Sequence, residues 1–493
     1  MNTQQEEAND VSIAWALEDC ADDVEVVQTW PGEGSNSSQK APTLLSYQRN
    51  RVKWGYQVDD LTDAIRGVKL LLDENQKFRY APAAESEEKI RKLGKTPVQV
   101  TAEYLKMLVT HAKDILCRRF GSALQTMDIH YTLTVPAIWS DKAKDATLQA
   151  ARLANVPSSC LFLLSEPEAA AACAIRTIQP NSMAEGDCFI VCDAGGGTVD
   201  LITYRITQNE PLRLEEVTEG TGAVCGSVIL DERFEDFLVR IIGKNRYNSL
   251  PAASKLIAMR HWQNYIKPSY QGRVHSDGFA DIGYFAPLPG LPDLPEFHLT
   301  GGLLYMEHQQ IEEIFEPIMA HIENLIDQQR LKAKEAGLST KAVILVGGLG
   351  ASEYLFKGLQ REFQGIDIMQ PTNAWSAVVS LDAEETRGAV YHGQDGNRVQ
   401  NRKSRCHYGV ATRTKYNPKL HGQDQKLTWC RFEEQWMVDG QMEWYIQKDR
   451  PIKISFYRTF GLNESLRMTD TLEFCVQEQA PKTHTSSKFL SQD

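Results

Sequence analysis

The chain has 493 residues, of which 42% are hydrophobic and 24% charged, a balance typical of a globular protein with two or more domains. Its net charge of -12 and the lack of a basic cluster interleaved with aromatic residues argue against a nucleic-acid surface. No apolar run approaches the roughly 18 residues that cross a bilayer, and the acidic start has no signal-peptide pattern. We therefore expect a cytoplasmic protein that binds neither nucleic acid nor membrane.

The ten cysteines include no C-x-x-C pair and no pair with a histidine at zinc-binding spacing. This usage predicts buried thiols instead of a disulfide framework or a metal site. Cys188 and Cys192 share one face of a predicted strand. Packing is the favoured interpretation there over redox chemistry, because a free cysteine behaves as a small hydrophobe.

The N-terminal part of the chain favours short strands and turns, after which the apolar period becomes helical. Strands are predicted at residues 11–17, 24–29, 41–47 and 52–56. A linker over residues 81–95 then precedes a long amphipathic helix over residues 101–120. His111 lies on the apolar face of this helix, so we expect it to pack in the core instead of binding a ligand.

Strands and helices alternate in the next segment, as in an open α/β sheet. The pattern predicts strands at residues 131–135 and 161–164 and helices at about 141–155 and 167–175. Ser165 and Glu168 have the spacing of a capping box, with Pro167 in the first turn. Glu166 therefore follows the carboxyl end of a strand directly, and ligands bind at this edge of open α/β sheets.

The stretch over residues 189–204 organises the rest of the chain. It predicts a buried strand, an acid, a glycine turn with a hydroxyl side chain, and a returning strand with a second acid. The polar and glycine positions are Asp193, Gly195, Gly196, Gly197, Thr198 and Asp200. We expect the glycines to turn with φ > 0 and to let a phosphate approach their amides. Acids beside phosphates usually act through a hydrated Mg²⁺. Taken alone, the stretch also fits an ordinary glycine-rich hairpin.

A second strand that ends in glycines follows later in the chain. The strand at residues 342–346 breaks at Gly347 and Gly348 and leads into a helix at about 352–363. A glycine turn before a helix amino terminus is a second candidate anion site. Between the two glycine turns, a strand is predicted at 212–221, helices at 251–275 and 307–336, and a Pro/Gly-rich connection at 278–295.

Four motifs together resemble the ATPase lobes of the 70-kDa heat-shock chaperones, in order and spacing, and most of all their divergent fungal-type relatives. The motifs are Thr134-Val135-Pro136-Ala137, Ser165-Glu166-Pro167-Glu168, Asp193-Ala194-Gly195-Gly196-Gly197-Thr198-Val199-Asp200 and Val346-Gly347-Gly348. The resemblance covers roughly residues 11–395. It implies an α/β, actin-like ATPase fold of two ribonuclease-H-like lobes around a nucleotide cleft, with a small β-rich C-terminal region. It also implies protein clients or co-chaperones as partners.

The resemblance assigns roles to individual residues. ATP or ADP and Mg²⁺ would be the cofactors. Gly195 to Thr198 would hold the β- and γ-phosphates, and Gly347 with Gly348 would lie along the adenosine and α-phosphate. Asp193 and Asp200 would act through the waters of Mg²⁺, and Glu166 would help to place the attacking water. Lys69 stands where the family has a catalytic lysine, and Lys267 falls near its adenine-contacting helix. Either lysine could also be a solvated surface charge.

The predicted domains follow from the same resemblance. Residues 1–185 would form a first lobe with a β-rich subdomain at about 24–100, and residues 186–395 a second lobe with a helix that returns to the first. Residues 405–478 would form a β-rich appendage, and residues 479–493 a tail. Residues 380–386 interrupt the family's return helix, and we expect them to form a bulged loop.

The chain also departs from the family's pattern. The family opens with a strand that ends in Asp-x-Gly-Thr, a first phosphate loop, whereas Ser12 to Ala16 here resembles the strand after that loop. We therefore expect an ATP-binding, chaperone-like ATPase module whose hydrolysis is impaired. The alternatives are an inactive nucleotide-sensing or protein-interaction scaffold, or a sugar kinase or phosphatase on the same fold.

Overall fold

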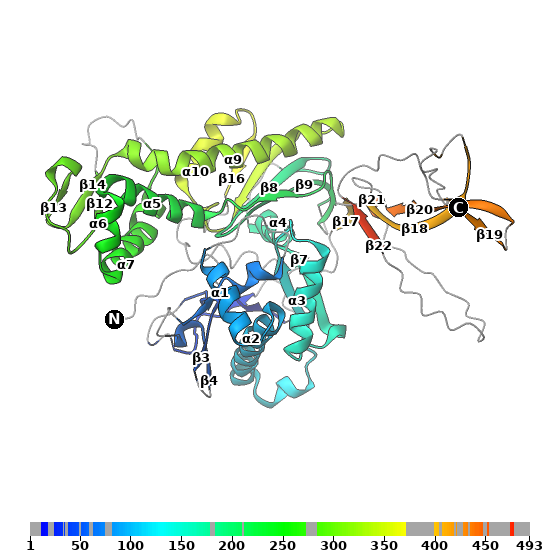
Figure 1. The fold of residues 1–493 in the computed structure, drawn as a ribbon, viewed down its shortest axis with the longest axis horizontal. Coiled ribbons are helices and arrows are strands. Elements are labelled where there is room, and N and C mark those ends of the chain that lie inside the picture. The colour runs from blue at the N-terminus through cyan, green and yellow to red at the C-terminus, as the bar shows by residue number, and fades with distance from the viewer. Residues whose placement is uncertain are drawn as a thin grey trace. The chain divides into compact units, whose positions relative to one another are not determined.

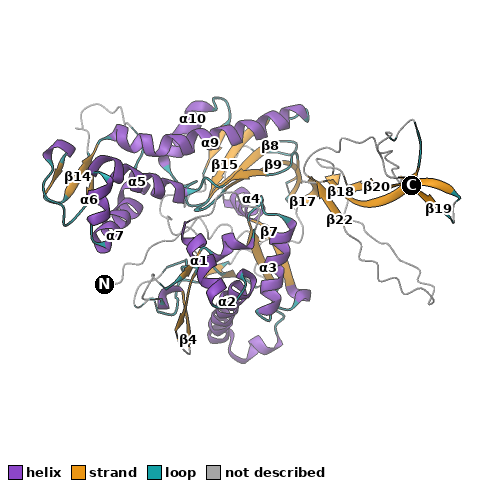
Figure 2. Ribbon diagram, in the orientation of Figure 1, coloured by secondary structure: helices purple, strands orange, loops and turns teal. Residues whose placement is uncertain are grey.

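The computed structural model describes residues 11–17, 24–32, 34, 38–48, 51–58, 63–73, 81–177, 183–209, 212–272, 283–370, 399–403, 407–418, 421, 427–431, 434–446, 451–452 and 474–477. The chain divides into two compact units. The first comprises Met1–Tyr204 and Gly220–Arg398, and the second comprises Arg205–Glu219 and Val399–Asp493. Figure 1 labels the elements, and Figure 2 distinguishes helices from strands. The boundary between the two predicted lobes lies inside the first unit and stays a prediction.

The first unit begins with small antiparallel sheets and two helices. The elements are β1 (Ala14–Trp15), β2 (Glu25–Val26), β3 (Leu44–Gln48), β4 (Arg51–Trp54), β5 (Ile65–Arg66), α1 (Ala81–Lys92) and α2 (Pro97–Phe120). The prediction of a linker at 81–95 was wrong, because α1 occupies most of it. Ala, Glu and Lys there are strong helix formers, although they carry no clear apolar period. His111 packs against Trp30, with 5.4 Å between the two rings, and its Nε2 lies 2.7 Å from the carbonyl oxygen of Thr29. It is half-buried, however, and not a core residue as expected.

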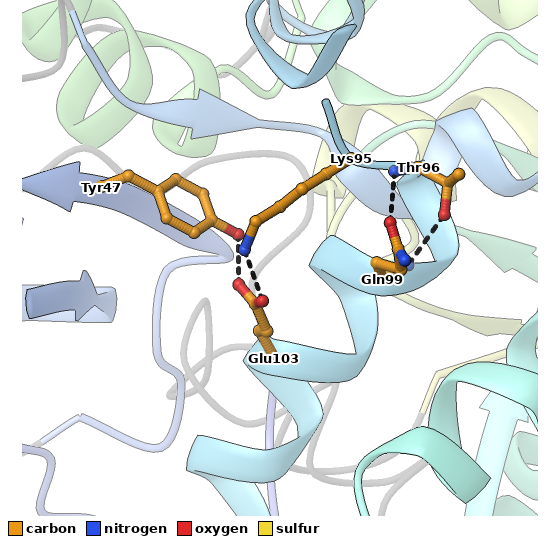
Figure 3. Close-up of polar contacts among 5 residues, drawn as sticks. All are labelled: Tyr47, Lys95, Thr96, Gln99 and Glu103. Carbon is orange, nitrogen blue, oxygen red and sulfur yellow. Dashed lines mark hydrogen bonds and ion pairs between the residues drawn. The ribbon is translucent and has the colours of Figure 1, made fainter. Parts of the chain in front are cut away.

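Helix α2 begins four residues earlier than its apolar period indicates. Thr96 caps it, because its hydroxyl accepts from the Gln99 amide at 3.2 Å and the Gln99 side chain accepts from the Thr96 amide at 2.9 Å. Figure 3 shows this capping box beside a second contact, in which Tyr47 and Lys95 both donate to Glu103 at 2.5 Å. Burial raises the pKa of the Tyr47 phenol, and the hydrogen bond to Glu103 raises it further. These contacts join β3 to the start of α2.

The predicted α/β segment is confirmed with small shifts of its boundaries. Its elements are β6 (Tyr131–Val135), α3 (Asp141–Leu153), β7 (Leu161–Ser165) and α4 (Glu166–Thr177), and β6 and β7 run parallel. The predicted capping box at Ser165 is wrong. Within the described part of the chain its buried hydroxyl makes no hydrogen bond, although the helix starts directly after it, at Glu166.

The main sheet of the first unit holds the predicted hairpin at its centre. Its strand order is β16 (Asp367–Met369), β15 (Thr340–Val346), β8 (Cys188–Ala194) and β9 (Val199–Gln208), and β11 (Thr221–Ala223) pairs with β9. Strands β15 and β8 run parallel, and all residues of β8 are buried. Helices α9 (His308–Glu335) and α4 both pack against these two strands, on opposite sides of the sheet in Figure 2. The parallel core therefore has both faces covered.

The remaining elements of the first unit surround one large hydrophobic core. They are α5 (Ser227–Ile242), α6 (Lys244–Ser249), α7 (Ala252–His261), a π-helical turn (Trp262–Ile266), α8 (Lys267–Ser269), β12 (Tyr284–Pro287), β13 (Leu299–Thr300), β14 (Leu303–Met306) and α10 (Glu353–Glu362). The expected connection at 278–295 thus contains strand β12.

Pro317 lies inside α9 and removes the hydrogen bond that the carbonyl of Glu313 would accept. Arg233 of α5 compensates, since its guanidinium donates to the carbonyl oxygens of Glu313 and Ile314, each at 2.9 Å.

The second unit is rich in β-structure. Strand β10 (Arg213–Glu216) pairs in parallel with β17 (Val399–Lys403), which pairs antiparallel with β21 (Pro451–Ile452). A separate sheet has the order β19 (Leu427–Cys430), β20 (Gln435–Ile446), β18 (His407–Lys415) and β22 (Phe474–Gln477). These strands bear out the expected β-rich C-terminal region.

Two expectations from the sequence concern the whole chain. No helix in the described ranges is both long and apolar enough to cross a membrane. The cytoplasmic location stays a prediction. Residues 380–386, expected to form a bulged loop, lie outside the described residues.

Candidate functional site

The two glycine turns, far apart in the sequence, meet at the ends of neighbouring parallel strands. Strands β8 and β15 pair so that Val346 lies opposite Asp193. Gly347 follows with φ 83°, and a Cβ there would lie 2.5 Å from the Asp193 Oδ1 and 2.6 Å from the carbonyl oxygen of Ala194. Only glycine fits such an approach in this backbone conformation. A hydrogen bond also holds the Gly347 turn in place, because Leu349 N donates to the Ala194 carbonyl at 2.8 Å.

The carbonyls of the glycine hairpin all point toward one helix. Those of Gly195, Gly196 and Gly197 accept from three successive amides at the start of α5: Ser227 at 3.1 Å, Val228 at 3.0 Å and Gly226 at 3.2 Å. In a planar trans peptide the N–H points opposite to the C=O. The amides of Gly196, Gly197 and Thr198 therefore point away from α5. Three successive N–H groups on one side form a concave donor surface suited to an anion.

The expected positive φ at the triple glycine was wrong. Gly347 has φ 83°, but none of Gly195, Gly196 and Gly197 is among the residues with positive φ. The docking of the hairpin carbonyls on α5 sets the peptide orientation instead. Gly226 permits that docking, because a Cβ at this position would overlap the carbonyl oxygen of Gly196.

Both acids of the hairpin and its threonine are buried. Asp193 and Asp200 are 4% and 1% exposed, and Thr198 is 9% exposed. The thiols nearby are inert: burial raises the pKa of Cys225 to about 12, helped by the charge of Asp200. Burial also raises the pKa of Cys192, with Asp193 next in effect. Both thiols stay protonated near neutral pH, and with Cys188 at 1% exposure the predicted packing role is confirmed.

Lys69 and Glu166 form an ion pair next to the hairpin. Lys69 lies in a short 3-10 helix (Val68–Leu72), and its Nζ is 2.5 Å from the Oε1 of Glu166, the first residue of α4. A Cβ at Gly197 would lie 3.9 Å from the Cδ2 of Leu70. The segment that carries Lys69 thus passes directly beside the glycine turn. Lys69 is therefore ion-paired, with its side chain 38% exposed.

Lys267 is engaged elsewhere. Its Nζ donates to the Oδ1 of Asp231 at 2.8 Å, and the indole of Trp262 donates to the same oxygen at 2.9 Å. Gln263 donates to the other carboxylate oxygen at 2.9 Å. Asp231 lies one turn beyond the amides of α5 that bind the hairpin, so this cluster anchors the π-helical turn to that helix. Gly348 faces open space, since a Cβ at this position would have no heavy atom within 4 Å.

One contact of the site was not predicted from the sequence. The backbone amide of Ile138 donates to the Oδ1 of Asp200 at 2.9 Å, and the two residues are 62 positions apart. Ile138 follows β6, so the bond joins the segment after the two-stranded sheet to the main sheet. Only the motif containing Pro136 hinted at a role for this segment.

Comparison with known proteins shows what the chain is similar to. No family model matches the sequence. The mouse protein "Heat shock 70 kDa protein 12A" is 24% identical, over 83% of this chain and 72% of its own length. The human "Heat shock 70 kDa protein 12B" is 25% identical, over 68% of this chain and 59% of its own length. A "Chaperone protein HscA homolog" of Neisseria meningitidis serogroup A is 30% identical, over 52% and 35%. The chain is thus similar to proteins of the 70-kDa heat-shock family over most of its length.

The similarity to this family agrees with the architecture. The mixed sheets and helices are those of an actin-like ATPase fold with a β-rich C-terminal region. At the level of the family, the relatives support a chaperone-like ATPase module. The role of each site residue remains a prediction.

Proposed function

We propose that the chain binds ATP or ADP with Mg²⁺ at the glycine hairpin and the Gly347 turn, as a chaperone-like ATPase module. The observation that carries this proposal is the orientation of the hairpin peptides. Because the carbonyls of Gly195, Gly196 and Gly197 are bonded to α5, three successive amides face the opposite side. A phosphate fits such a surface, and no side chain of the hairpin glycines obstructs it.

The hairpin would hold the β- and γ-phosphates, with the hydroxyl of Thr198 as a further donor. Gly347 and Gly348 lie where the second parallel strand ends, which is the edge at which open α/β sheets bind ligands. They would lie along the adenosine and the α-phosphate. Lys267 would face the adenine side from its cluster with Asp231.

The acids suit a hydrated Mg²⁺. Across the described ranges, no group of three or more His, Cys, Asp or Glu side chains is arranged to hold a metal ion by itself. Mg²⁺ usually keeps several waters and is held by one or two carboxylates together with substrate phosphates. Asp193 and Asp200, buried at either end of the glycine turn, fit that donor set. When bound, the ion would neutralise phosphate charge.

Glu166 would orient the attacking water, and Lys69 would hold Glu166 in position. The ion pair fixes the position of the Glu166 carboxylate, so that it can orient a water by accepting a hydrogen bond. The ammonium of Lys69, 38% exposed at its side chain, can also stabilise charge on a phosphoryl group. Phosphoryl transfer needs mainly positioning and charge stabilisation of this kind.

Calorimetric titration with Mg-ATP and Mg-ADP tests the proposal, with Gly196→Val as the decisive variant. Its backbone φ does not require glycine, so the variant should fold, while the branched side chain fills the space where phosphate would meet the amides. We expect binding by the unmodified chain and none by Gly196→Val. Equal binding by both would refute the assignment of the hairpin.

The rival functions predict different titrations. A chain that binds no nucleotide at all would favour the protein-interaction scaffold. Binding with turnover only after a sugar is added would favour the kinase. We infer that clients or co-chaperones are the protein partners of an active module, and the relatives' names support this at the level of the family.

A further inference from the structure

The contact between Ile138 and Asp200 depends on a third residue, Gly222. Strand β11 pairs with β9 so that Gly222 lies opposite Asp200. A Cβ at Gly222 would lie 2.5 Å from the Cγ2 of Ile138 and 2.6 Å from the carbonyl oxygen of Val199. Gly222 is not among the glycines with positive φ, so its backbone conformation is open to any residue. Space alone therefore requires glycine here, and the space is occupied by Ile138 together with the backbone of β9.

Strand β11 is itself held in place by a buried amide. Gln329 of α9 is 0% exposed. Its Oε1 accepts from the Thr203 hydroxyl of β9 at 2.6 Å, and its Nε2 donates to the Thr221 hydroxyl of β11 at 2.9 Å. One side chain thus ties together the two strands that carry Asp200 and Gly222. Because β11 is anchored in this way, it cannot easily shift to make room for a side chain added at Gly222.

We propose that Gly222 and Ile138 are positioning residues for Asp200. The missing side chain of Gly222 lets Ile138 approach, and the Ile138 amide then fixes the orientation of the Asp200 carboxylate. This inference rests on the proposed function, in which Asp200 acts on the waters of Mg²⁺. It adds that the segment after β6 sets the geometry of the Mg²⁺ site from another sheet. Donors that orient such side chains typically change metal affinity by about 10- to 100-fold when they are lost.

The first test is Gly222→Ala, with nucleotide affinity measured in Mg²⁺ and in EDTA. We expect Mg-ATP to bind about 10- to 100-fold more weakly, while ATP in EDTA binds as it does to the unmodified chain. Gly358→Ala is the matched control. Its Cβ would also lie 2.5 Å from a neighbour, but that neighbour is the flexible end of Met319 in α9, not a residue of the hairpin. A purely structural defect would weaken both affinities together, and that result would overturn the inference.

A second variant tests the steric cause. Ile138→Leu removes the branched Cγ2 methyl but keeps the backbone amide. In the Gly222→Ala background it should recover part of the lost Mg²⁺-dependent affinity. The recovery should be partial, because the added methyl still meets the carbonyl of Val199. No recovery at all would show that Ile138 is not the group displaced.

Amide hydrogen exchange tests the contact between Ile138 and Asp200 in the absence of nucleotide. In the free protein, the Ile138 amide should exchange faster in Gly222→Ala than in the unmodified chain or in Gly358→Ala. Exchange that is equally slow in all three would overturn the inference, whether or not nucleotide binds. Absence of nucleotide binding by the unmodified chain would instead refute the proposed function. The two failures are therefore distinguishable.

Discussion

Substitution of Gly347 by alanine tests how closely the two glycine turns must approach. Gly347 adopts φ 83°, and an added Cβ would lie 2.5 Å from Asp193 Oδ1 and 2.6 Å from the Ala194 carbonyl oxygen. Two costs therefore combine. The left-handed conformation costs a residue with a Cβ about 1–2 kcal/mol. Forcing an extra methyl into a packed position costs about 1–3 kcal/mol more.

Gly365 separates the two costs. It has the same φ of 83°, in the turn between α10 and β16, but no heavy atom lies within 4 Å of its Cβ position. Gly365→Ala should therefore lose only the conformational part, about 1–2 kcal/mol, partly offset by the stiffer unfolded chain. Gly347→Ala should lose about 1–3 kcal/mol beyond that.

Urea unfolding followed by circular dichroism measures the difference, and calorimetry with Mg-ATP measures the function. We expect Gly347→Ala to be the less stable variant and to lose nucleotide binding, while Gly365→Ala keeps it. Equal stability of the two variants would refute the reasoning, since the turn at Gly347 would then be able to move away from Asp193 without cost.

Two further predictions concern stability. Arg233→Ala should lower the free energy of unfolding by about 1–3 kcal/mol, because the Glu313 carbonyl loses its donor. The loss should be smaller in a Pro317→Ala background, where a backbone N–H becomes available. Urea titration of the unmodified chain, the two single variants and the double variant measures this coupling, and strictly additive losses would contradict the prediction. Burial raises the pKa of Asp187, but its hydrogen bonds and the charge of Lys341 lower it below 3.8 overall. The stabilisation is therefore present above the unfolded pKa and lost as the pH falls through the lower folded value. The melting temperatures of the unmodified chain and Asp187→Asn should converge in acid. A difference between them that does not change with pH would contradict this prediction.

Local chemistry made much of this fold predictable. The strands that contain residues 131–135 and 342–346 were found because apolar runs end at a proline or at glycines. The long helix at 307–336 was found to within one residue at each end from its apolar stripe. Helix α1 was missed because its buried face, at Ala83, Ser86 and Ile90, has only one large apolar side chain. Such a face gives a weak apolar stripe, and periodicity depends on that stripe.

The parts of the site that join distant segments could not be predicted. The amide of Ile138 reaches Asp200 only after two sheets have formed, and a backbone donor leaves no mark on its own residue type. Gly222 must be glycine because Ile138 and the Val199 carbonyl fill the space beside it, and these neighbours meet it only in the folded chain. Likewise, the pairing of Lys69 with Glu166 depends on the placement of a short 3-10 helix against α4.

The direction of the hairpin amides illustrates the same limit most clearly. Three successive glycines can turn in either sense, and the motif alone suggested positive φ. The structure shows otherwise, because the carbonyls dock on the first amides of α5. That docking requires glycine at position 226, where a Cβ would overlap the Gly196 carbonyl. The glycine that decides which way the hairpin presents its donors is therefore not in the hairpin. It lies at the start of the helix against which the hairpin folds.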